Sequence, residues 1–174
     1  MNLFKKIFKN KIKDNKIFSI CKGTYKSLNL VKDFYDKDMG VGYAIEIDKN
    51  QNIIDVLAPF DSKIETIFPS KHALTLTSEN GLKTLIHIGV ETVKLNGEGF
   101  KQLVQKGENV KRGQKLISVD LKVLTDSDLN TDIMFVVLNE NWPTPTSTKK
   151  INWNPDIKDG IQVNSDTEIL SVEI

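Results

Sequence analysis

Apolar and polar side chains alternate along the middle of the chain, in short runs separated by clusters of Gly, Asn and Asp. Alternation with a period of two is typical of strands that bury one face, and Gly, Asn and Asp favour the turns between them. The pattern predicts strands over 43–48, 53–58, 64–68, 73–77, 82–88, 114–120 and 133–138. Seven or more strands need two packed sheets or a barrel. We therefore expect an all-β fold, an antiparallel β-sandwich or barrel with very little helix.

The rest of the main body adds little to this architecture. Helix is expected only as a turn after Thr92 and as a short stretch after Asp120. The segment 139–160, rich in Asn, Pro, Thr and Lys, is predicted to be an irregular connection. The apolar run 169–174 is predicted to close the fold as a last strand. Residues 17–174 would then form a single domain.

Residues 1–16 carry a different pattern, that of a basic amphipathic tail. Over residues 1–13, apolar side chains fall on one helical face and five lysines occupy the others. A segment of this kind can rest on anionic lipid, with its apolar side chains below the headgroups and its lysines beside them. It can equally be a flexible tail that only improves solubility. The sequence leaves both interpretations open.

Composition excludes several classes of protein. The 24 basic and 23 acidic side chains leave a net charge of only +1, whereas a protein that binds nucleic acid usually carries a large basic excess. The single cysteine, Cys21, cannot form an internal disulfide and fits a reducing compartment. The longest apolar run, 133–138, is far too short to cross a bilayer, and lysines interrupt any secretory signal near the start. We expect a cytoplasmic monomer that does not bind nucleic acid.

The chain has only two histidines, His72 and His87, and both lie on a predicted hairpin around Asn80-Gly81. A two-residue type I′ turn would place them as diagonal neighbours on one face of the sheet, and a four-residue loop would place them directly opposite each other. A loop of three or five residues would put them on opposite faces. The sequence predicts an even-length loop and two imidazoles on one face.

Three interpretations of such a pair compete. Each histidine can be structural, which is the commoner case for a histidine taken alone. The pair can bind zinc, although a stable site wants three or four ligands and no further donor stands at a recognised spacing. A neutral imidazole can also attack phosphorus and hold the phosphoryl group, while the second imidazole bonds its oxygens. A neighbouring glycine such as Gly89 would let the backbone approach the same oxygens.

The residues around the histidines resemble a known family. The block from Leu85 to Phe100, which reads LIHIGVETVKLNGEGF, together with His72-Ala73, is similar to the signature of the glucose-type (type 1) IIA component of the bacterial phosphoenolpyruvate:sugar phosphotransferase system. The similarity extends in order from Asp33 to Leu138. It implies a β-sandwich without a required cofactor.

The resemblance assigns roles to individual residues. His87 matches the residue that is transiently phosphorylated, and His72 matches the histidine needed to pass the phosphoryl group on. The implied donor is the phosphocarrier HPr, and the implied acceptor is the IIB domain of a permease for glucose or a related sugar. Ser70 matches a threonine that bonds the supporting histidine. The apolar patch that docks both partners would comprise Phe34, Met39, Val41, Phe68 and Val93.

The chain also departs from the family pattern. Glu91 stands where the family's motif has an aspartate, and it would keep the role of facing a partner's arginine. Val31 replaces an acid that commonly precedes the conserved Phe34, and Asp33 or Asp36 is expected to substitute for it. In some members of the family the unphosphorylated form binds regulatory targets, with zinc bridging the two histidines to a partner's carboxylate. Nothing in the sequence indicates such a role.

Two other classes fit the sequence less well. A zinc peptidase on a related β scaffold would need a His-x-His pair, but Ile88-Gly89 follows His87. A biotinyl or lipoyl carrier is suggested by the segment 107–116, but it would need a lysine at a hairpin tip in a motif that is absent. The sequence thus favours phosphoryl transfer by His87.

Overall fold

The computed structural model describes residues 14–34, 38–141 and 150–173, and antiparallel strands dominate these ranges. The strands, in chain order, are β1 (Asp14–Phe18), β2 (Gly23–Ser27), β3 (Gly40–Glu46), β4 (Ile53–Leu57), β5 (Ser62–Ile67), β6 (Ala73–Ser78), β7 (Lys83–Ile88), β8 (Phe100–Gln102), β9 (Asn109–Val110), β10 (Lys115–Asp120), β11 (Ile133–Leu138), β12 (Lys150–Trp153), β13 (Gln162–Val163) and β14 (Glu168–Glu173). The helical pieces are α1 (Leu121–Asp126) and the 3₁₀ turns η2 (Leu28–Leu30), η3 (Thr92–Leu95) and η4 (Asn139–Asn141).

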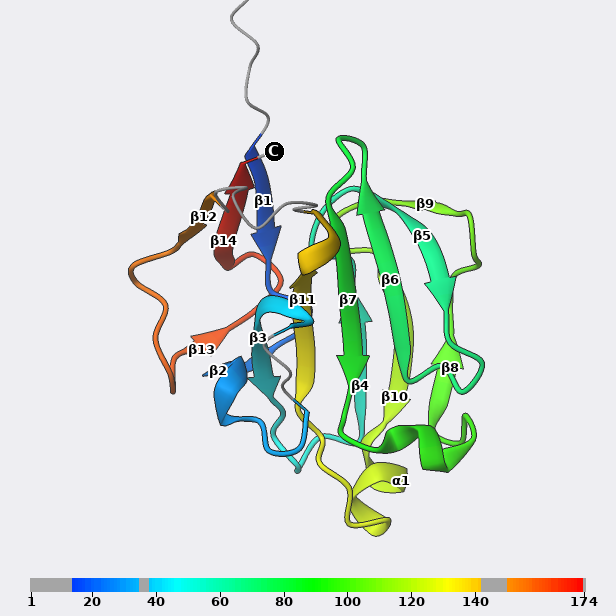
Figure 1. The fold of residues 1–174 in the computed structure, drawn as a ribbon. Coiled ribbons are helices and arrows are strands. Elements are labelled where there is room, and N and C mark those ends of the chain that lie inside the picture. The colour runs from blue at the N-terminus through cyan, green and yellow to red at the C-terminus, as the bar shows by residue number, and fades with distance from the viewer. Residues whose placement is uncertain (1–13, 35–37, 142–149, 174) are drawn as a thin grey trace, which may run out of the picture.

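One large sheet forms the front of the molecule in Figure 1. Its eight strands run in the order β13-β2-β3-β11-β7-β6-β5-β9, and the three-stranded sheet β4-β10-β8 lies behind it (Figure 1). A second three-stranded sheet, β1-β14-β12, brings both ends of the described chain together beside the large one. The predicted fold class, antiparallel sheets packed together with very little helix, is confirmed.

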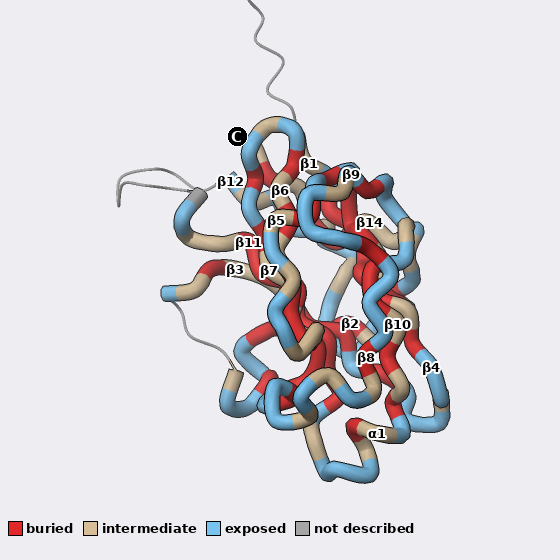
Figure 2. The backbone as a smooth tube through the Cα atoms, turned by 90° about the vertical axis from the view of Figure 1, so that its right-hand side faces the viewer, coloured by how far each residue is buried: buried red, intermediate tan, exposed pale blue. Residues whose placement is uncertain are grey.

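The main core fills the space between the large sheet and the β4-β10-β8 sheet. Figure 2, turned by 90°, shows buried stretches of both layers facing each other. Fully buried side chains from each layer meet there, among them Ile86 and Phe135 in front and Val56 and Leu116 behind. The alternation of apolar side chains in the sequence therefore matches the inner face of the strands.

A second, smaller apolar cluster lies on the opposite, outer face of the large sheet. Its buried members are Leu28, Val31, Ala44, Val90, Met134 and Val136. Strand β11 is buried on both faces, since it supplies Phe135 to the main core and Met134 to this cluster. A run that is apolar at every position, such as 133–138, is what a doubly covered strand requires.

The seven strands predicted from alternation are all present, with ends shifted by up to three residues. The helix after Asp120 and the turn after Thr92 are confirmed as α1 and η3. The expectation that 139–160 is irregular is wrong for Lys150–Trp153, which form β12 at the edge of the small sheet. Lys150-Ile151-Asn152-Trp153 do alternate polar and apolar side chains, but the run is only four residues long and lies in a segment rich in Asn, Pro, Thr and Lys, so it was not predicted as a strand.

Most of the expected amphipathic tail, residues 1–13, lies outside the described residues. Its last residues, from Asp14 on, form the start of β1, which pairs with β14. Across the described part of the chain, no helix has the length and apolar character needed to span a membrane.

Candidate functional site

The hairpin that carries the histidines differs from the predicted one. Ala73 pairs with His87 across β6 and β7, so His72 is offset by one position from both predicted registers. The backbone N–H of Gly81 donates to the Ser78 carbonyl at 2.9 Å, and Gly81 adopts a φ of 90°. This is a three-residue loop with a bulge, a common hairpin form. The prediction of an even-length loop is wrong.

The two imidazoles meet nevertheless, because His72 lies in the turn before β6 and does not follow the alternation of that strand. Lys71 has a φ of 59°, and its N–H donates to the carbonyl of Phe68 at 2.7 Å. The His72 carbonyl accepts a hydrogen bond from Ile88 N–H at 2.8 Å. The centroids of the His72 and His87 rings are 5.0 Å apart, with the ring planes at 79°.

The backbone fixes the tautomer of His87. Its Nδ1 lies 2.8 Å from the carbonyl oxygen of Gly89. A carbonyl oxygen can only accept a hydrogen bond, so Nδ1 carries the proton and donates it. In the neutral ring the lone pair is therefore on Nε2, which leaves that nitrogen free to act as a nucleophile.

A short hydrogen bond orients His72 in turn. Its Nδ1 lies 2.6 Å from the Ser70 hydroxyl oxygen, and the residue is only 7% exposed. A hydroxyl can donate as well as accept. When Ser70 donates to Nδ1, the neutral ring carries its proton on Nε2 and can offer it to an oxygen atom beside His87.

Burial keeps both rings neutral. Burial is the larger cause that lowers the pKa of His87 from 6.5 to about 4, followed by the repulsion that His72 exerts on a protonated His87. The hydrogen bond to the Gly89 carbonyl opposes this change. Burial also lowers the pKa of His72. A charged imidazole loses solvation when buried, so the neutral form with its free lone pair dominates at neutral pH.

Gly89 holds a position that no other residue can occupy without rearrangement. Its φ is 68°, and a Cβ atom there would lie 2.4 Å from Thr92 Cγ2 and 2.5 Å from the Asn130 carbonyl oxygen. Glu91, two residues on, also has a positive φ of 60°. Its exposed carboxylate forms an ion pair with Lys94 at 2.7 Å. The predicted acidic residue thus stands at the rim of the site, beside a cation from its own turn.

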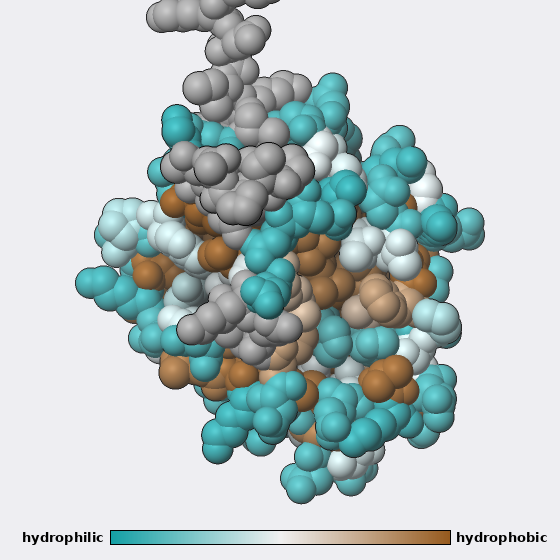
Figure 3. All heavy atoms as spheres, viewed as in Figure 1, coloured by the Kyte–Doolittle hydropathy of each residue, from teal (hydrophilic) through white to brown (hydrophobic). Residues whose placement is uncertain are grey.

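Apolar side chains surround the two rings. The Phe34 ring centroid is 4.9 Å from that of His87, and the Phe68 centroid is 5.7 Å from that of His72. Met39 packs with Phe34 on the outer cluster, while Val93 is 52% exposed. Figure 3 shows apolar surface in the middle of this face, bordered by hydrophilic side chains.

Val41 is not brought to the site. It pairs with Val137 and shares the inner face of the sheet with the buried Tyr43, whereas His87 lies on the outer face with Met134. Val31, where the family commonly has an acid, is buried in the outer cluster. Asp33 is exposed with a φ of 60°, and Asp36 falls outside the described residues.

The structure adds residues that sequence reasoning missed. Pro69 and Asn96 join Phe68, Ser70, His72 and Val93 around a shallow hollow of about 350 Å³. Met134 lies directly beside His87 on the neighbouring strand. The uninterrupted apolar run 133–138 was the available signal for Met134, because a strand covered on both faces must present alternate residues to the outer surface.

Two imidazoles alone do not make a metal site. Within the ranges that the structure describes, no group of three or more His, Cys, Asp or Glu side chains could hold a metal ion. Zinc bound by His72 and His87 would have to take its remaining ligands from a docked partner.

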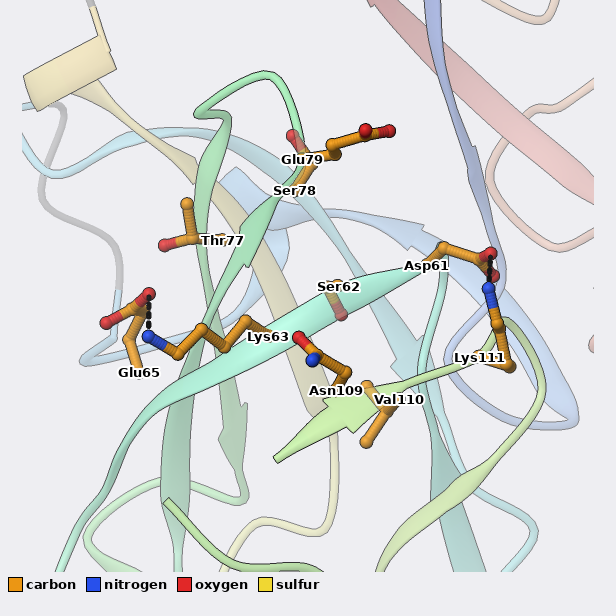
Figure 4. Close-up of a pocket in the computed structure, with 10 residues that line it drawn as sticks. All are labelled: Asp61, Ser62, Lys63, Glu65, Thr77, Ser78, Glu79, Asn109, Val110 and Lys111. Atoms are coloured by element: carbon orange, nitrogen blue, oxygen red, sulfur yellow. Dashed lines mark hydrogen bonds and ion pairs between the residues drawn. The ribbon is translucent and has the colours of Figure 1, made fainter. Parts of the chain in front are cut away.

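A larger hollow of about 550 Å³ lies by the tip of the β6–β7 hairpin (Figure 4). It is lined by Asp61, Ser62, Lys63, Glu65, Thr77, Ser78, Glu79, Asn109, Val110 and Lys111. Lys63 pairs with Glu65 at 4.0 Å and Lys111 with Asp61 at 2.8 Å, so its two cations are matched by neighbouring acids. With neither a histidine nor a cysteine in its lining, this hollow offers no strong nucleophile.

Comparison with known proteins identifies the class to which this fold and paired-imidazole site belong. The family model described as "phosphoenolpyruvate-dependent sugar phosphotransferase system, EIIA 1" matches residues 15–142. The chain belongs to this family, and it is an EIIA component, a phosphocarrier of the phosphotransferase system.

Individual relatives agree with this assignment. The chain is 35% identical over 144 residues to the "PTS system glucose-specific EIIA component" of Staphylococcus epidermidis, with 80% of this chain and 84% of the relative covered. It is 39% identical over 130 residues to the "PTS system glucose-specific EIICBA component" of Staphylococcus carnosus, with 74% of this chain and 19% of that longer protein covered. Among solved structures, the glucose permease IIA from Mycoplasma capricolum matches with 32% identity and a TM-score of 0.70, over 91% of this chain and 96% of that one.

Proposed function

We propose that this protein serves glucose uptake by accepting a phosphoryl group on His87 from phospho-HPr and passing it to the IIB domain of a sugar permease. The observation that carries the proposal is the 2.8 Å contact between His87 Nδ1 and the Gly89 carbonyl. It leaves the Nε2 lone pair free on a ring whose pKa is lowered to about 4. The glucose specificity rests on relatives whose names carry it.

The transfer is a displacement at phosphorus. The Nε2 lone pair of His87 attacks the phosphorus atom of phospho-HPr, a new N–P bond forms, and the donor's N–P bond breaks with its electron pair returning to the donor's imidazole. Nδ1–H continues to donate to Gly89, so the phosphorylated ring keeps its position. In the second step a cysteine thiolate of IIB attacks the same phosphorus, and His87 leaves as the neutral imidazole.

His72 acts on the phosphoryl oxygens. With Ser70 donating to its Nδ1, His72 presents Nε2–H toward the neighbouring ring, whose centroid is 5.0 Å away. A neutral imidazole stabilises the phosphoryl group less than an arginine would. That suits an intermediate that must be handed on, so His72 supports departure of the group without trapping it.

Partner docking uses the apolar rim of Phe34, Met39, Phe68 and Val93, with Glu91 at its border. These side chains surround the rings with little charge, and contact with a partner would exclude water from the reacting atoms. In the free protein Glu91 pairs with Lys94. A basic group on a partner can replace Lys94 during transfer.

Incubation with phosphoenolpyruvate, enzyme I and HPr, followed by intact mass measurement, tests the proposal. The wild type is expected to gain one acid-labile phosphate, and His87→Ala is expected to gain none. An unmodified wild type, or a modified His87→Ala protein, contradicts the assignment.

The role of His72 is tested by following both transfers. His72→Ala is expected to accept phosphate from phospho-HPr but to lose transfer to IIB. Normal onward transfer by this variant would remove His72 from the mechanism.

A further inference from the structure

A chain of polar contacts leads from the backbone beside His87 to a shielded ion pair on the same face of the sheet. Gly89, whose carbonyl holds His87 Nδ1, donates its own N–H to the carbonyl of Asp132 at 2.8 Å. The Asp132 carboxylate then pairs with Lys26 Nζ at 2.9 Å. The chain joins three segments that are remote in sequence.

The register of the large sheet places these groups on one face. Lys26 lies opposite Ala44, Ala44 opposite Met134, and Met134 opposite His87, on the neighbouring strands β2, β3, β11 and β7 (Figure 1). Asp132 directly precedes β11, and its ion pair with Lys26 places its carboxylate on the same face. The ion pair therefore lies on the same face of the sheet as His87, with Lys26 three strands away from it.

Burial distinguishes this ion pair from solvent-exposed pairs of the same protein. The side chains of Asp132 and Lys26 are 5% and 24% exposed, against 34% and 62% for Glu168 and Lys16, whose separation is also 2.9 Å. Removing one partner of a shielded pair leaves an uncompensated charge and is costly, whereas removing an exposed one is nearly neutral. Asp132 is thus held in place by Lys26 far more firmly than a surface carboxylate would be.

The segment held by Lys26 is the one against which the Gly89 turn rests. Asp132 N–H donates to the side chain of Asn130 at 2.8 Å, and Asn130 in turn accepts from Val90 N–H through its carbonyl at 3.3 Å. A Cβ atom on Gly89 would come within 2.5 Å of that carbonyl. With so little space between the two segments, a displacement of 130–132 moves Gly89, and with it the oxygen that fixes the His87 proton.

We propose that Lys26 and Asp132 are positioning residues for phosphoryl transfer, acting through the backbone of Gly89 to fix the tautomer and orientation of His87. Neither side chain touches the reacting atoms. The inference rests on the proposed role of His87, but the tautomer can be measured without any transfer reaction.

The test compares Lys26→Met with Lys16→Met, which breaks the exposed pair at the same distance. Nitrogen-15 NMR of the imidazoles in the unphosphorylated protein reports the share of His87 that carries its proton on Nδ1. Lys26→Met is expected to lower that share and to slow phosphoryl acceptance at saturating phospho-HPr, by up to about 100-fold for a displacement near 1 Å. Lys16→Met is expected to leave both unchanged.

Two further variants separate positioning from simple loss of stability. Lys26→Arg keeps the charge and is expected to retain the wild-type tautomer. In Lys26→Met/Asp132→Asn no unpaired charge remains, so it is expected to regain stability relative to Lys26→Met, but not the full transfer rate. A wild-type His87 tautomer and a normal rate per folded molecule in Lys26→Met would overturn the proposal. Failure of His87 to accept phosphate in every protein, including the wild type, would instead overturn the proposed function.

Discussion

The carbonyl oxygen of Gly89 decides which nitrogen of His87 carries the proton, and burial decides whether the ring is charged. The two effects act together, since a neutral ring with its proton on Nδ1 has its lone pair on Nε2. They also link the site to the stability of the fold. An imidazole that stays neutral because it is buried resists protonation in the folded state.

This link predicts how stability depends on pH. His87 titrates at 6.5 when unfolded and at about 4 when folded, so between these values the unfolded chain binds more protons. The contribution of His87 to the free energy of unfolding is fully present above pH 6.5 and is lost as the pH falls toward 4. Each pH unit in that interval lowers the free energy of unfolding by at most about 1.4 kcal/mol. His87→Gln is expected to lose less stability than the wild type between pH 7.5 and 5, measured by urea unfolding. Equal losses in the two proteins would show that His87 is not shielded.

Ser70 gives a second prediction at this scale. Ser70→Ala leaves Nδ1 of the nearly buried His72 without its partner, a loss worth about 1 kcal/mol, or roughly a fivefold change in rate. Transfer to IIB is expected to slow by about this factor in rapid-quench measurements, and acceptance from phospho-HPr is expected to change less. Ser70→Thr retains the hydroxyl and serves as the control. If Ser70→Ala and Ser70→Thr transfer equally fast, the hydroxyl has no part in orienting His72.

Among the structural elements, the connection from β7 to η3 does most to shape the site. It turns sharply through Gly89 and Glu91, both with positive φ, and so returns the Gly89 carbonyl to His87. Thr92 Oγ1 donates to the Ile88 carbonyl at 2.5 Å and closes the turn. The geometry around His87, the proposed phosphoryl site, is therefore set by this connection more than by any strand.

Gly89→Ala tests that statement. The new methyl group would clash with Thr92 and Asn130, and the backbone would be strained. We therefore expect the free energy of unfolding to fall by about 2 kcal/mol or more and phosphoryl acceptance to slow. Gly81→Ala is the matched control, since its φ is 90° but a Cβ there meets nothing within 4 Å. The free energy of unfolding of Gly81→Ala is expected to fall by only about 1 kcal/mol, and its phosphoryl acceptance is expected to match the wild type. Comparable losses in both variants would mean that backbone strain, without the clash, accounts for the effect.

The sequence predicted the elements better than it predicted their ends and connections. Strands with one buried face, such as β4 and β7, follow from alternation because the core selects every second residue. The edge strands β12 and β13 are only four and two residues long, so too few positions alternate for the pattern to predict them, although Val163 is buried in the main core and Ile151 packs against it.

The candidate site shows the same limit. The histidines were correctly expected to meet, but the hairpin reasoning behind that expectation failed. Alternation holds within a strand, and His72 lies in a turn whose course depends on the positive φ of Lys71. A lysine in the sequence gives no signal for a positive φ. Val41 shows the converse, because a position carried over by resemblance alone landed on the inner face of the sheet.

At the scale of the whole molecule, the single arginine of the sequence turns out to join remote segments. Its guanidinium lies 4.2 Å above the Phe18 ring and donates to the Ser165 carbonyl at 3.2 Å. Its backbone N–H donates to Asp61 at 2.9 Å. Arg112 thus connects the turn before β10 to β1 and to the loop before β14, and it is not among the side chains around the histidines.

Arg112→Ala is therefore expected to affect stability and leave chemistry unchanged. The stacking on Phe18 and the partly exposed ion pair with Asp166 are together worth about 1 kcal/mol. Thermal unfolding should show this loss, and transfer from phospho-HPr per folded molecule should match the wild type. Arg112→Lys keeps the charge without the planar group, so its thermal stability is expected to lie between those of the wild type and Arg112→Ala. A slower transfer in Arg112→Ala would place the arginine in the phosphoryl pathway.

The pairing of β1 with β14 has a geometric consequence for how such a domain can be tethered. Asp14 lies opposite Glu173, so the described chain enters and leaves at one point, while β7 runs away from that point toward its end at Ile88 (Figure 1). A polypeptide attached at either end of the described chain would therefore join the protein on the side remote from the end of β7.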